Sequence, residues 1–186
     1  CDWLRAPLGV VSGNRPRTMQ FEAKKDGVHG LIAGGTGSGK SELLMTLIVS
    51  LAAHYDPEAL NFVLVDYKGG GAFEPFRPLP HVVDIVTNLN KSGVRRMFTA
   101  INAEMQRRQQ LNTATRTKDI IEYRQKGYHL RWPDGQPGVP YPSLFLIIDE
   151  YAEMIATNPE YKSELDSITR VGRAQGVHLL LAAQRP

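Results

Sequence analysis

Apolar and polar positions follow two different periods along the chain, and together they predict alternating strands and helices. Short apolar runs that end at glycine, proline or acidic residues are typical of buried strands, which we expect at 28–34, 61–66, 81–88, 143–150 and 177–183. Longer segments with apolar residues at helical spacing predict helices at 41–55, 91–111, 117–127 and 158–173. Strands buried on both faces that alternate with helices indicate an α/β fold, with a mainly parallel sheet flanked by helices.

The segment from Lys91 to Leu111 is the clearest amphipathic helix. Its apolar residues recur at helical spacing and are Val94, Met97, Phe98, Ile101 and Met105. Four arginines are expected on the remaining faces, namely Arg95, Arg96, Arg107 and Arg108. A basic helix face is compatible with nucleic-acid binding, although such a face is more often simply solvated.

Other segments carry more local expectations. The helix over 41–55 is apolar almost all round, so we expect other elements to enclose it. Asn158 and Pro159 suit the N-cap and first position of a helix that runs to about Arg173. The opening segment contains a Gly-Asn turn signal and predicts a hairpin within about 1–27, while 131–142 is rich in proline and glycine and predicts a loop.

The composition is that of an ordinary globular domain in a reducing compartment. The 186 residues suffice for a single domain, and the net charge of +3 is too small to indicate a nucleic-acid partner by itself. Cys1 is the only cysteine, so an internal disulfide is excluded and a cytosolic setting fits best. The apolar stretch 43–53 is too short to span a bilayer.

The ends of the chain suggest a piece of a longer protein. It starts at Cys1 rather than Met and stops at Pro186, directly after a strand-like apolar run. We expect one ATPase-type domain over 1–186, in which the hairpin precedes a nucleotide-binding core over about 28–186 that is truncated at its C-terminus.

Residues 34–41 read GGTGSGKS and match G-x-x-x-x-G-K-[ST] in full, between a predicted strand and a predicted helix. Glycines allow backbone N–H groups to surround an anion, and the helix N-terminus adds its positive dipole end. Lys40 can reach the β- and γ-phosphates, and the Ser41 hydroxyl can bind Mg²⁺. We therefore expect a nucleotide site formed by Gly34, Gly35, Thr36, Gly37, Ser38, Gly39, Lys40, Ser41 and Glu42.

The predicted strand 143–150 ends in two acids that complete the chemistry of nucleotide hydrolysis. Asp149 is expected to hold Mg²⁺ through its water shell, and Glu150 to orient the attacking water as a base. Adjacent Asp and Glu at a strand end are typical of additional-strand P-loop ATPases. In these enzymes a polar residue after the last strand, here Gln184, senses the γ-phosphate.

Arginines near the C-terminus are candidates for a finger that reaches the nucleotide site of a neighbouring subunit. They are Arg170, Arg173 and Arg185, and Arg173 is the one we favour. The alternative for each is a solvated arginine on a helix or loop.

A GTPase is the main rival among nucleotide enzymes. DYKG at 66–69 fits D-x-x-G, and NKSG at 90–93 begins like the guanine-binding N-K-x-D. Gly93, however, lacks the carboxylate that would bind guanine, and the helix 41–55 leaves no room for a switch loop before the next strand. A small-molecule kinase would leave Glu150 unexplained.

Several segments together resemble the FtsK/SpoIIIE family of hexameric motor ATPases. They are APLGV, HGLIAGGTGSGKSE, NFVLVDYKGG, LPHVVDIVTN, LIIDEYAEM and GRAQGVHLLLAAQRP, and they span nearly the whole chain. Within that family, DPEALNFVLVDYKGG followed by LPH and TNL resembles the EccC and EssC ATPases of type VII secretion more than the DNA pumps. DNA pumps usually carry DPK in place of DYKGG.

The resemblance implies a RecA-like additional-strand core, ATP with Mg²⁺, and a ring, expected to be a hexamer, in which each site is completed by its neighbour. It also implies a cytoplasmic domain of a membrane-anchored bacterial protein, in contact with membrane-embedded secretion components through regions outside this chain. The favoured function is a motor for protein export, acting on a secreted protein. A translocase of double-stranded DNA and a nucleotide-gated structural module with little turnover remain alternatives.

Overall fold

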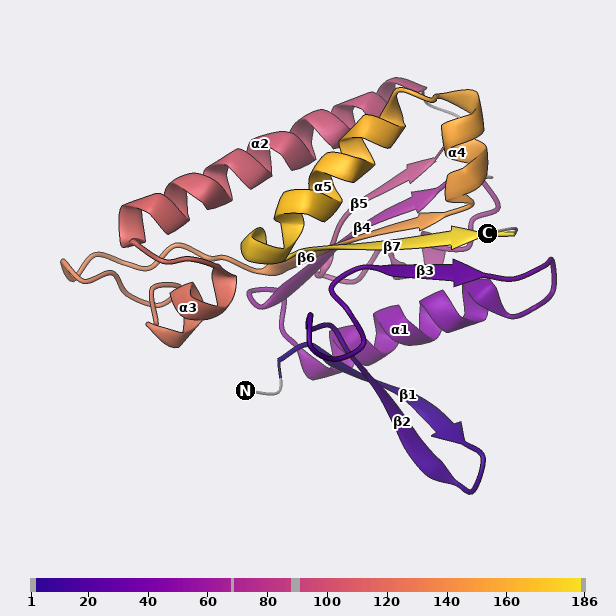
Figure 1. The fold of residues 1–186 in the computed structure, drawn as a ribbon, viewed down its shortest axis with the longest axis horizontal. Helices are drawn as coiled ribbons and strands as arrows, with labels where there is room; N and C mark the ends of the chain where they lie inside the picture. The colour runs from indigo at the N-terminus through magenta and orange to yellow at the C-terminus, as the bar shows by residue number, and fades with distance from the viewer. Residues whose placement is uncertain (1–2, 68, 88–90, 185–186) are drawn as a thin grey trace.

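The computed structural model describes residues 3–67, 69–87 and 91–184, and a parallel sheet forms its centre. The strands are β3 (Gly30–Ala33), β4 (Leu60–Asp66), β5 (Val82–Thr87), β6 (Ser143–Asp149) and β7 (Val177–Ala183). In space they follow the order β3-β7-β6-β4-β5, and every neighbouring pair is parallel (Figure 1). All five carboxyl ends therefore lie along one edge of the sheet, and the expected α/β class is confirmed.

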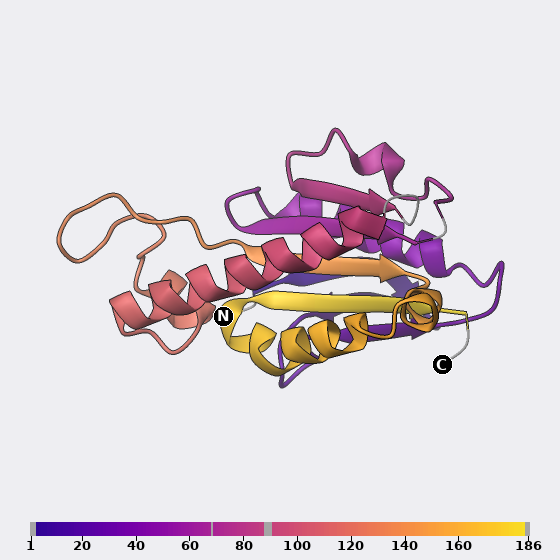
Figure 2. The same ribbon diagram turned by 90° about the horizontal axis from the view of Figure 1, so that it is seen from above.

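Helices cover both faces of this sheet. They are α1 (Lys40–His54), α2 (Lys91–Thr115), α3 (Ile120–Gln125), α4 (Tyr151–Thr157) and α5 (Tyr161–Gln175), with a short 3₁₀ turn at Glu74–Phe76. The helices α2 and α5 lie over one face and α1 over the other (Figures 1 and 2). Successive residues of β6 alternate between the two layers, since Phe145 and Ile147 pack with α1 whereas Leu146 and Ile148 pack with α2 and α5.

Two apolar segments are less enclosed than their composition predicts. On α1, Leu44, Leu47 and Ile48 are buried, but Val49 is 55% exposed, so the expectation of an enclosed helix is wrong. Leu31 is 54% exposed because β3 is an edge strand that pairs only with β7 among the described residues. Hydrophobic composition gives the driving force for burial but does not show how many layers are available to cover a segment.

The helix after β6 differs most from the prediction. A short helix, α4, immediately follows Glu150 and was not expected. Asn158 is the C-cap residue of α4, and α5 begins only at Tyr161 with Glu160 as its N-cap residue, so the predicted N-cap role of Asn158 is wrong. Its side-chain amide instead donates a hydrogen bond to the hydroxyl of Tyr67, 3.0 Å away.

On α2 the predicted apolar residues are buried, but one predicted surface arginine is not on the surface. Arg108 is 1% exposed, and it donates to the carboxylate of Glu104 and to the backbone oxygen of Gln175, each at 2.7 Å. It lies three and seven residues after Met105 and Ile101, on the stripe that faces the core. Arg107 is bound to both oxygens of the same Glu104 carboxylate.

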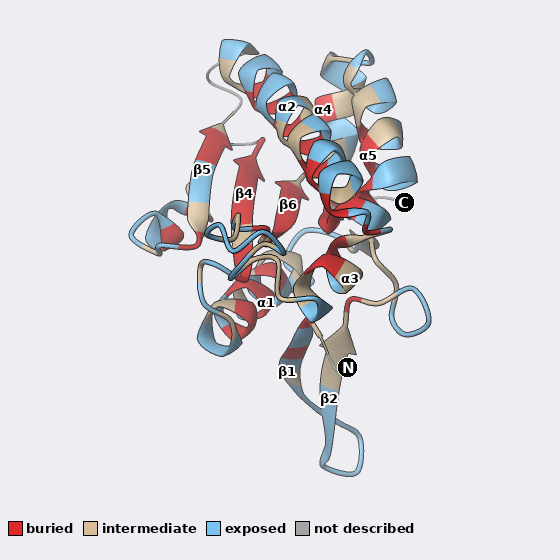
Figure 3. Ribbon diagram, turned by 90° about the vertical axis from the view of Figure 1, so that its left-hand side faces the viewer, coloured by how far each residue is buried: buried red, intermediate tan, exposed pale blue. Residues whose placement is uncertain are grey.

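The predicted hairpin is present as β1 (Arg5–Val11) and β2 (Arg15–Gln20), and it projects from the body of the molecule (Figures 1 and 3). Its base is tied to the core by Leu4, Ala6 and Phe21, while Val10 near its tip is exposed. Among the described residues, no helix combines the length and the apolar character needed to cross a membrane.

Candidate nucleotide-binding site

The glycine-rich loop joins β3 to α1 in a conformation that requires several of its glycines. Gly37 and Gly39 have φ angles of 76° and 88°, where a side chain is strained. A Cβ atom on Gly34 would lie 2.5 Å from the hydroxyl oxygen of Ser38. The amide of Gly34 donates to the carbonyl of Ala183 on β7, which fixes the loop to the sheet. Residues 35–39 are exposed, so their backbone is accessible to an anion.

Lys40 and Glu150 meet at this loop. The ammonium of Lys40 donates to the carbonyl oxygen of Gly34 at 2.8 Å and lies 3.9 Å from a carboxylate oxygen of Glu150. Both side chains are about nine-tenths buried. The two residues predicted to bind phosphate and to activate water, far apart in the sequence, are thus brought together by the fold.

Asp149, the last residue of β6, has one carboxylate oxygen without a hydrogen-bond partner among the described residues. Its Oδ1 atom is buried and accepts no hydrogen bond from the described residues. Burial raises the pKa of Asp149, and the nearby charges of Glu150 and Asp66 raise it further, while Lys40 lowers it. A buried, unsatisfied carboxylate beside other acids favours a cation.

Mg²⁺ fits this donor set. Ser41 stands in the first turn of α1, and Asp149 offers its unpartnered oxygen. Among the described residues no group of three or more His, Cys, Asp or Glu could hold a metal ion by itself. Mg²⁺ in nucleotide sites is usually held by one or two side chains, with phosphate oxygens and water supplying the remaining ligands.

The strand order places the other candidates at the same edge. Since β7 lies between β3 and β6, Gln184, the residue directly after β7, follows a strand flanked by the P-loop strand and the Asp149 strand. Thr36, Ser38 and Gly35 belong to the exposed loop, and Glu42 lies on the exposed side of the first turn of α1.

Sequence reasoning missed Asp66 as a residue of this edge. It ends β4 directly opposite Asp149 in the parallel register, is 3% exposed, and accepts hydrogen bonds from the amides of Gly70 and Ala72. The signal was available, because Asp66 ends a buried apolar strand as Asp149 does. In the sequence, however, Asp66 stands out only as part of the DYKG and DYKGG patterns and not as a residue of the nucleotide site.

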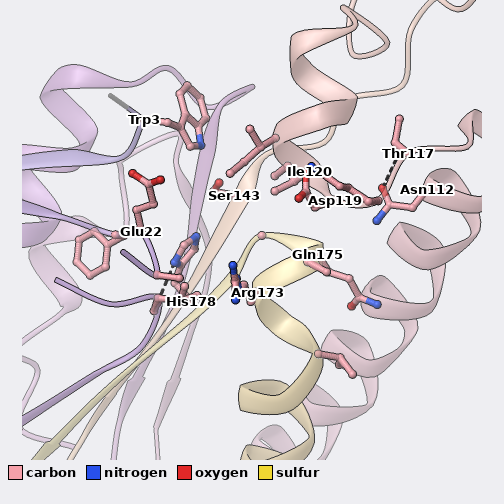
Figure 4. Close-up of a pocket in the computed structure, with 18 of the residues that line it drawn as sticks. Trp3, Glu22, Asn112, Thr117, Asp119, Ile120, Ser143, Arg173, Gln175 and His178 are labelled. Atoms are coloured by element: carbon pink, nitrogen blue, oxygen red, sulfur yellow. Dashed lines mark hydrogen bonds between the residues drawn. The ribbon is translucent and has the colours of Figure 1, made fainter. Parts of the chain in front are cut away.

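Neither Arg170 nor Arg173, the two arginine-finger candidates that the structure describes, is brought to the loop within one chain. Arg185 lies outside the described residues. Arg170 and Arg173 are near the end of α5, beside the start of β7, and line a cavity of about 930 Å³ together with Trp3, Asp119 and His178 (Figure 4). This cavity is at the amino-terminal end of β7, whereas the P-loop is at the carboxyl edge of the sheet. A finger role in a neighbouring subunit therefore stays a prediction.

Comparison with known proteins gives consistent matches over nearly the whole chain. The model of the FtsK/SpoIIIE family matches residues 2–186. The ESX secretion system protein EccC of Geobacillus thermodenitrificans is 41% identical over 185 residues, which are 98% of this chain and 12% of that protein.

Two solved structures from Thermomonospora curvata are also similar. The cytoplasmic domain of its type VII secretion ATPase EccC has a TM-score of 0.87 and 42% identity, covering 98% of this chain and 21% of that one. EccC (ATPases 2 and 3) in complex with a signal sequence peptide has a TM-score of 0.82 and 25% identity, covering 100% of this chain and 34% of that one.

Proposed function

The chain belongs to the FtsK/SpoIIIE family and is a P-loop ATPase domain, and from this premise we propose that it hydrolyses ATP with Mg²⁺ to drive protein export by a type VII-like secretion system. The observation that carries the hydrolytic role is the meeting of Lys40 and Glu150 at the P-loop. The chain spans 12% of the EccC relative, so the work of the whole machine is part of the proposal.

Each residue at this edge has a defined task in the proposed reaction. The exposed amides of the loop and Lys40 bind the phosphates, and Ser41 and Asp149 hold Mg²⁺, which when bound offsets the phosphate charge. Glu150 orients a water molecule and takes its proton as the oxygen attacks the γ-phosphorus. The bond from phosphorus to the bridging oxygen breaks, releasing ADP and phosphate. Gln184 senses the γ-phosphate from the end of β7.

The two Thermomonospora curvata structures support a position within a multi-ATPase protein. Identity is 42% to the cytoplasmic domain of that EccC but only 25% to its ATPases 2 and 3. If this chain corresponded to ATPase 2 or 3, its identity to the two structures would be similar. The higher identity to the cytoplasmic domain therefore favours a different ATPase module of that EccC as the counterpart. We therefore place this chain as the counterpart of an ATPase module other than the second and third.

A secreted protein is the proposed substrate. The EccC structure with ATPases 2 and 3 contains a signal sequence peptide. The basic face of α2, the feature that is compatible with DNA binding, is smaller than predicted, because Arg108 is buried and Arg107 is paired with Glu104. Of the four α2 arginines, Arg95 and Arg96 are exposed and Arg107 is partly exposed. The other proposed partners are further copies of the chain in a ring, whose sites an arginine such as Arg173 completes. We also propose that regions outside this chain bind membrane-embedded components and that this domain lies on the cytoplasmic side, which the similarity to the cytoplasmic domain of EccC supports.

The test is steady-state ATP hydrolysis by the complete protein with a candidate secreted substrate, with long double-stranded DNA, and with neither. We expect activation by the secreted substrate, no effect of DNA, and loss of the activated rate in Glu150→Gln. Several-fold stimulation by DNA that disappears in Glu150→Gln would instead identify a DNA translocase. No turnover under any condition would identify a nucleotide-gated structural module.

A further inference from the structure

Glu150 occupies a backbone conformation that must be held by its surroundings. Its φ and ψ angles are 60° and 47°, in the left-handed region that a residue with a side chain adopts only at a cost in free energy. Such strain persists where neighbouring structure enforces it, and it concentrates at functional sites. The turn at Glu150 connects β6 to α4, so the orientation of its carboxylate depends on how these two elements are fixed relative to each other.

The segment before Glu150 is fixed by the sheet. The strand β6 is paired with β4 along its whole length, and the last pair in register is Asp66 with Asp149. The Asp66 carboxylate in turn accepts hydrogen bonds from the amides of Gly70 and Ala72, which closes the loop that follows β4. The end of β4 therefore holds Asp149, the residue immediately before Glu150, in a fixed position.

The segment after Glu150 is fixed to the same place. The helix α4 spans only Tyr151–Thr157 and buries Met154 completely. At its far end, the side-chain amide of Asn158 donates to the hydroxyl of Tyr67 at 3.0 Å. Tyr67 directly follows Asp66 and is 1% exposed, so its ring has little freedom to move. Both sides of the strained turn are thus attached to consecutive residues at the end of β4.

We propose that Tyr67 and Asn158 form a positioning pair for Glu150: their hydrogen bond holds α4 against the end of β4 and so keeps the strained turn in the orientation that aims Glu150 at the P-loop. This inference rests on the proposed role of Glu150 in hydrolysis. It also gives a role to Tyr67 of DYKGG, to which the nucleotide chemistry assigns none, and explains why Asn158 caps no helix start.

The first experiment compares variants that remove or keep this hydrogen bond. Tyr67→Phe and Asn158→Ala remove it, whereas Asn158→Asp keeps a partner, because the tyrosine hydroxyl can donate to a carboxylate. In the complete protein we expect kcat for ATP hydrolysis to fall roughly five-fold in the first two variants with KM unchanged. Asn158→Asp should retain most of the wild-type rate. Tyr161→Phe is the matched control, since it removes a hydroxyl from another tyrosine packed on the same cluster.

The second experiment asks whether the pair acts through Glu150. Tyr67→Phe added to Glu150→Gln should cause no further loss of the residual rate, since there is no catalytic carboxylate left to position. An equal loss in both backgrounds would overturn the proposal. So would a fall in melting temperature accompanied by a rise in KM and no change in kcat, which would show a structural role alone.

Amide hydrogen exchange separates this inference from the proposed function. Tyr67→Phe should speed exchange over residues 151–158 and leave the P-loop residues 34–41 unchanged, whether or not the protein turns over ATP. Unchanged exchange over 151–158 would overturn the positioning pair. If the wild type shows no turnover, the proposed function fails and the exchange result alone decides whether Tyr67 and Asn158 hold this turn.

Discussion

Two groups of buried charges in this molecule differ in how far the protein satisfies them. In the first, Arg108 is bound by Glu104, by the backbone oxygens of Gln175 and Gly176, and by the ring of Tyr141, 5.2 Å from the guanidinium carbon. In the second, at the carboxyl edge of the sheet, the acids Asp66, Asp149 and Glu150 lie near Lys40, and an oxygen of Asp149 has no partner among the described residues.

The difference separates structural charges from charges that await a ligand. A buried ion that is already paired with an acid and with backbone oxygens offers little to a substrate, and removing it takes a donor from those partner groups. Acids that lie close together in a buried site instead repel each other, and binding of a metal ion or a proton relieves this repulsion. The first group should therefore control stability, and the second should control catalysis with little contribution to stability.

The largest effect is expected from Glu150→Gln. The change removes the base while keeping the shape of the side chain, so we expect kcat for ATP to fall by about 10² to 10⁴. The melting temperature should stay within a few degrees, because the folded state loses one acid from an acid-rich cluster. Steady-state hydrolysis checks the fall in kcat, thermal unfolding checks the melting temperature, and binding of an ATP analogue shows whether the nucleotide still binds. A loss of analogue binding equal to the loss of rate would show that Glu150 serves binding instead.

Arg108→Met should show the opposite behaviour. The variant removes the buried donor of the Gln175 backbone oxygen and one of the two arginines that bind Glu104, and breaking a buried pair in this way costs about 3 to 5 kcal/mol. Urea unfolding of the purified chain measures this cost. Among molecules that remain folded, nucleotide binding should be unchanged, because Arg108 contacts the end of α5 rather than the P-loop. Weakened nucleotide binding in the folded fraction would contradict the separation of the two groups.

Asp149→Asn gives a pH-dependent test of the second group. The folded-state pKa of Asp149 is raised above its ordinary value of 3.8, so ionising this carboxyl costs stability as the pH rises through the folded pKa. The variant should therefore be more stable than the wild type at neutral pH, and the difference should vanish below about pH 3.8, the ordinary pKa of the carboxyl. Urea unfolding at several pH values without Mg²⁺ checks the sign. Stabilisation by Mg²⁺ with nucleotide should be reduced in the variant.

The comparison also shows which parts of the molecule the sequence could predict. The P-loop and the acids after 143–148 were predicted because each is local: a glycine spacing, and a strand that ends in charge. The five strands were predicted for the same reason, since each is a short apolar run between turn residues. Helical periodicity correctly placed the apolar face of α2.

What failed depends on partners that are distant in the sequence. Arg108 lies on the core stripe of α2, and its burial depends on Gln175 at the end of α5, 67 residues further on, as well as on the nearby Glu104. Asn158 has the residue type of a helix N-cap, yet Tyr67, 91 residues away, binds its side chain. Asp66 belongs to the site because β4 pairs with β6, and strand order cannot be read from the pattern of one strand.

The smallest expected effect comes from Arg107→Gln, the neighbour that shares Glu104 with Arg108. The bonds of Arg107 to Glu104 are as short as those of Arg108, at 2.7 Å, but the side chain of Arg107 is 40% exposed against 2% for Arg108. Water can replace an exposed partner, so we expect a loss below about 1 kcal/mol that shrinks further in high salt. Urea unfolding at low and high salt, side by side with Arg108→Met, measures the difference. Equal costs for the two arginines would mean that hydrogen-bond geometry, rather than burial, determines what a charge contributes in this fold.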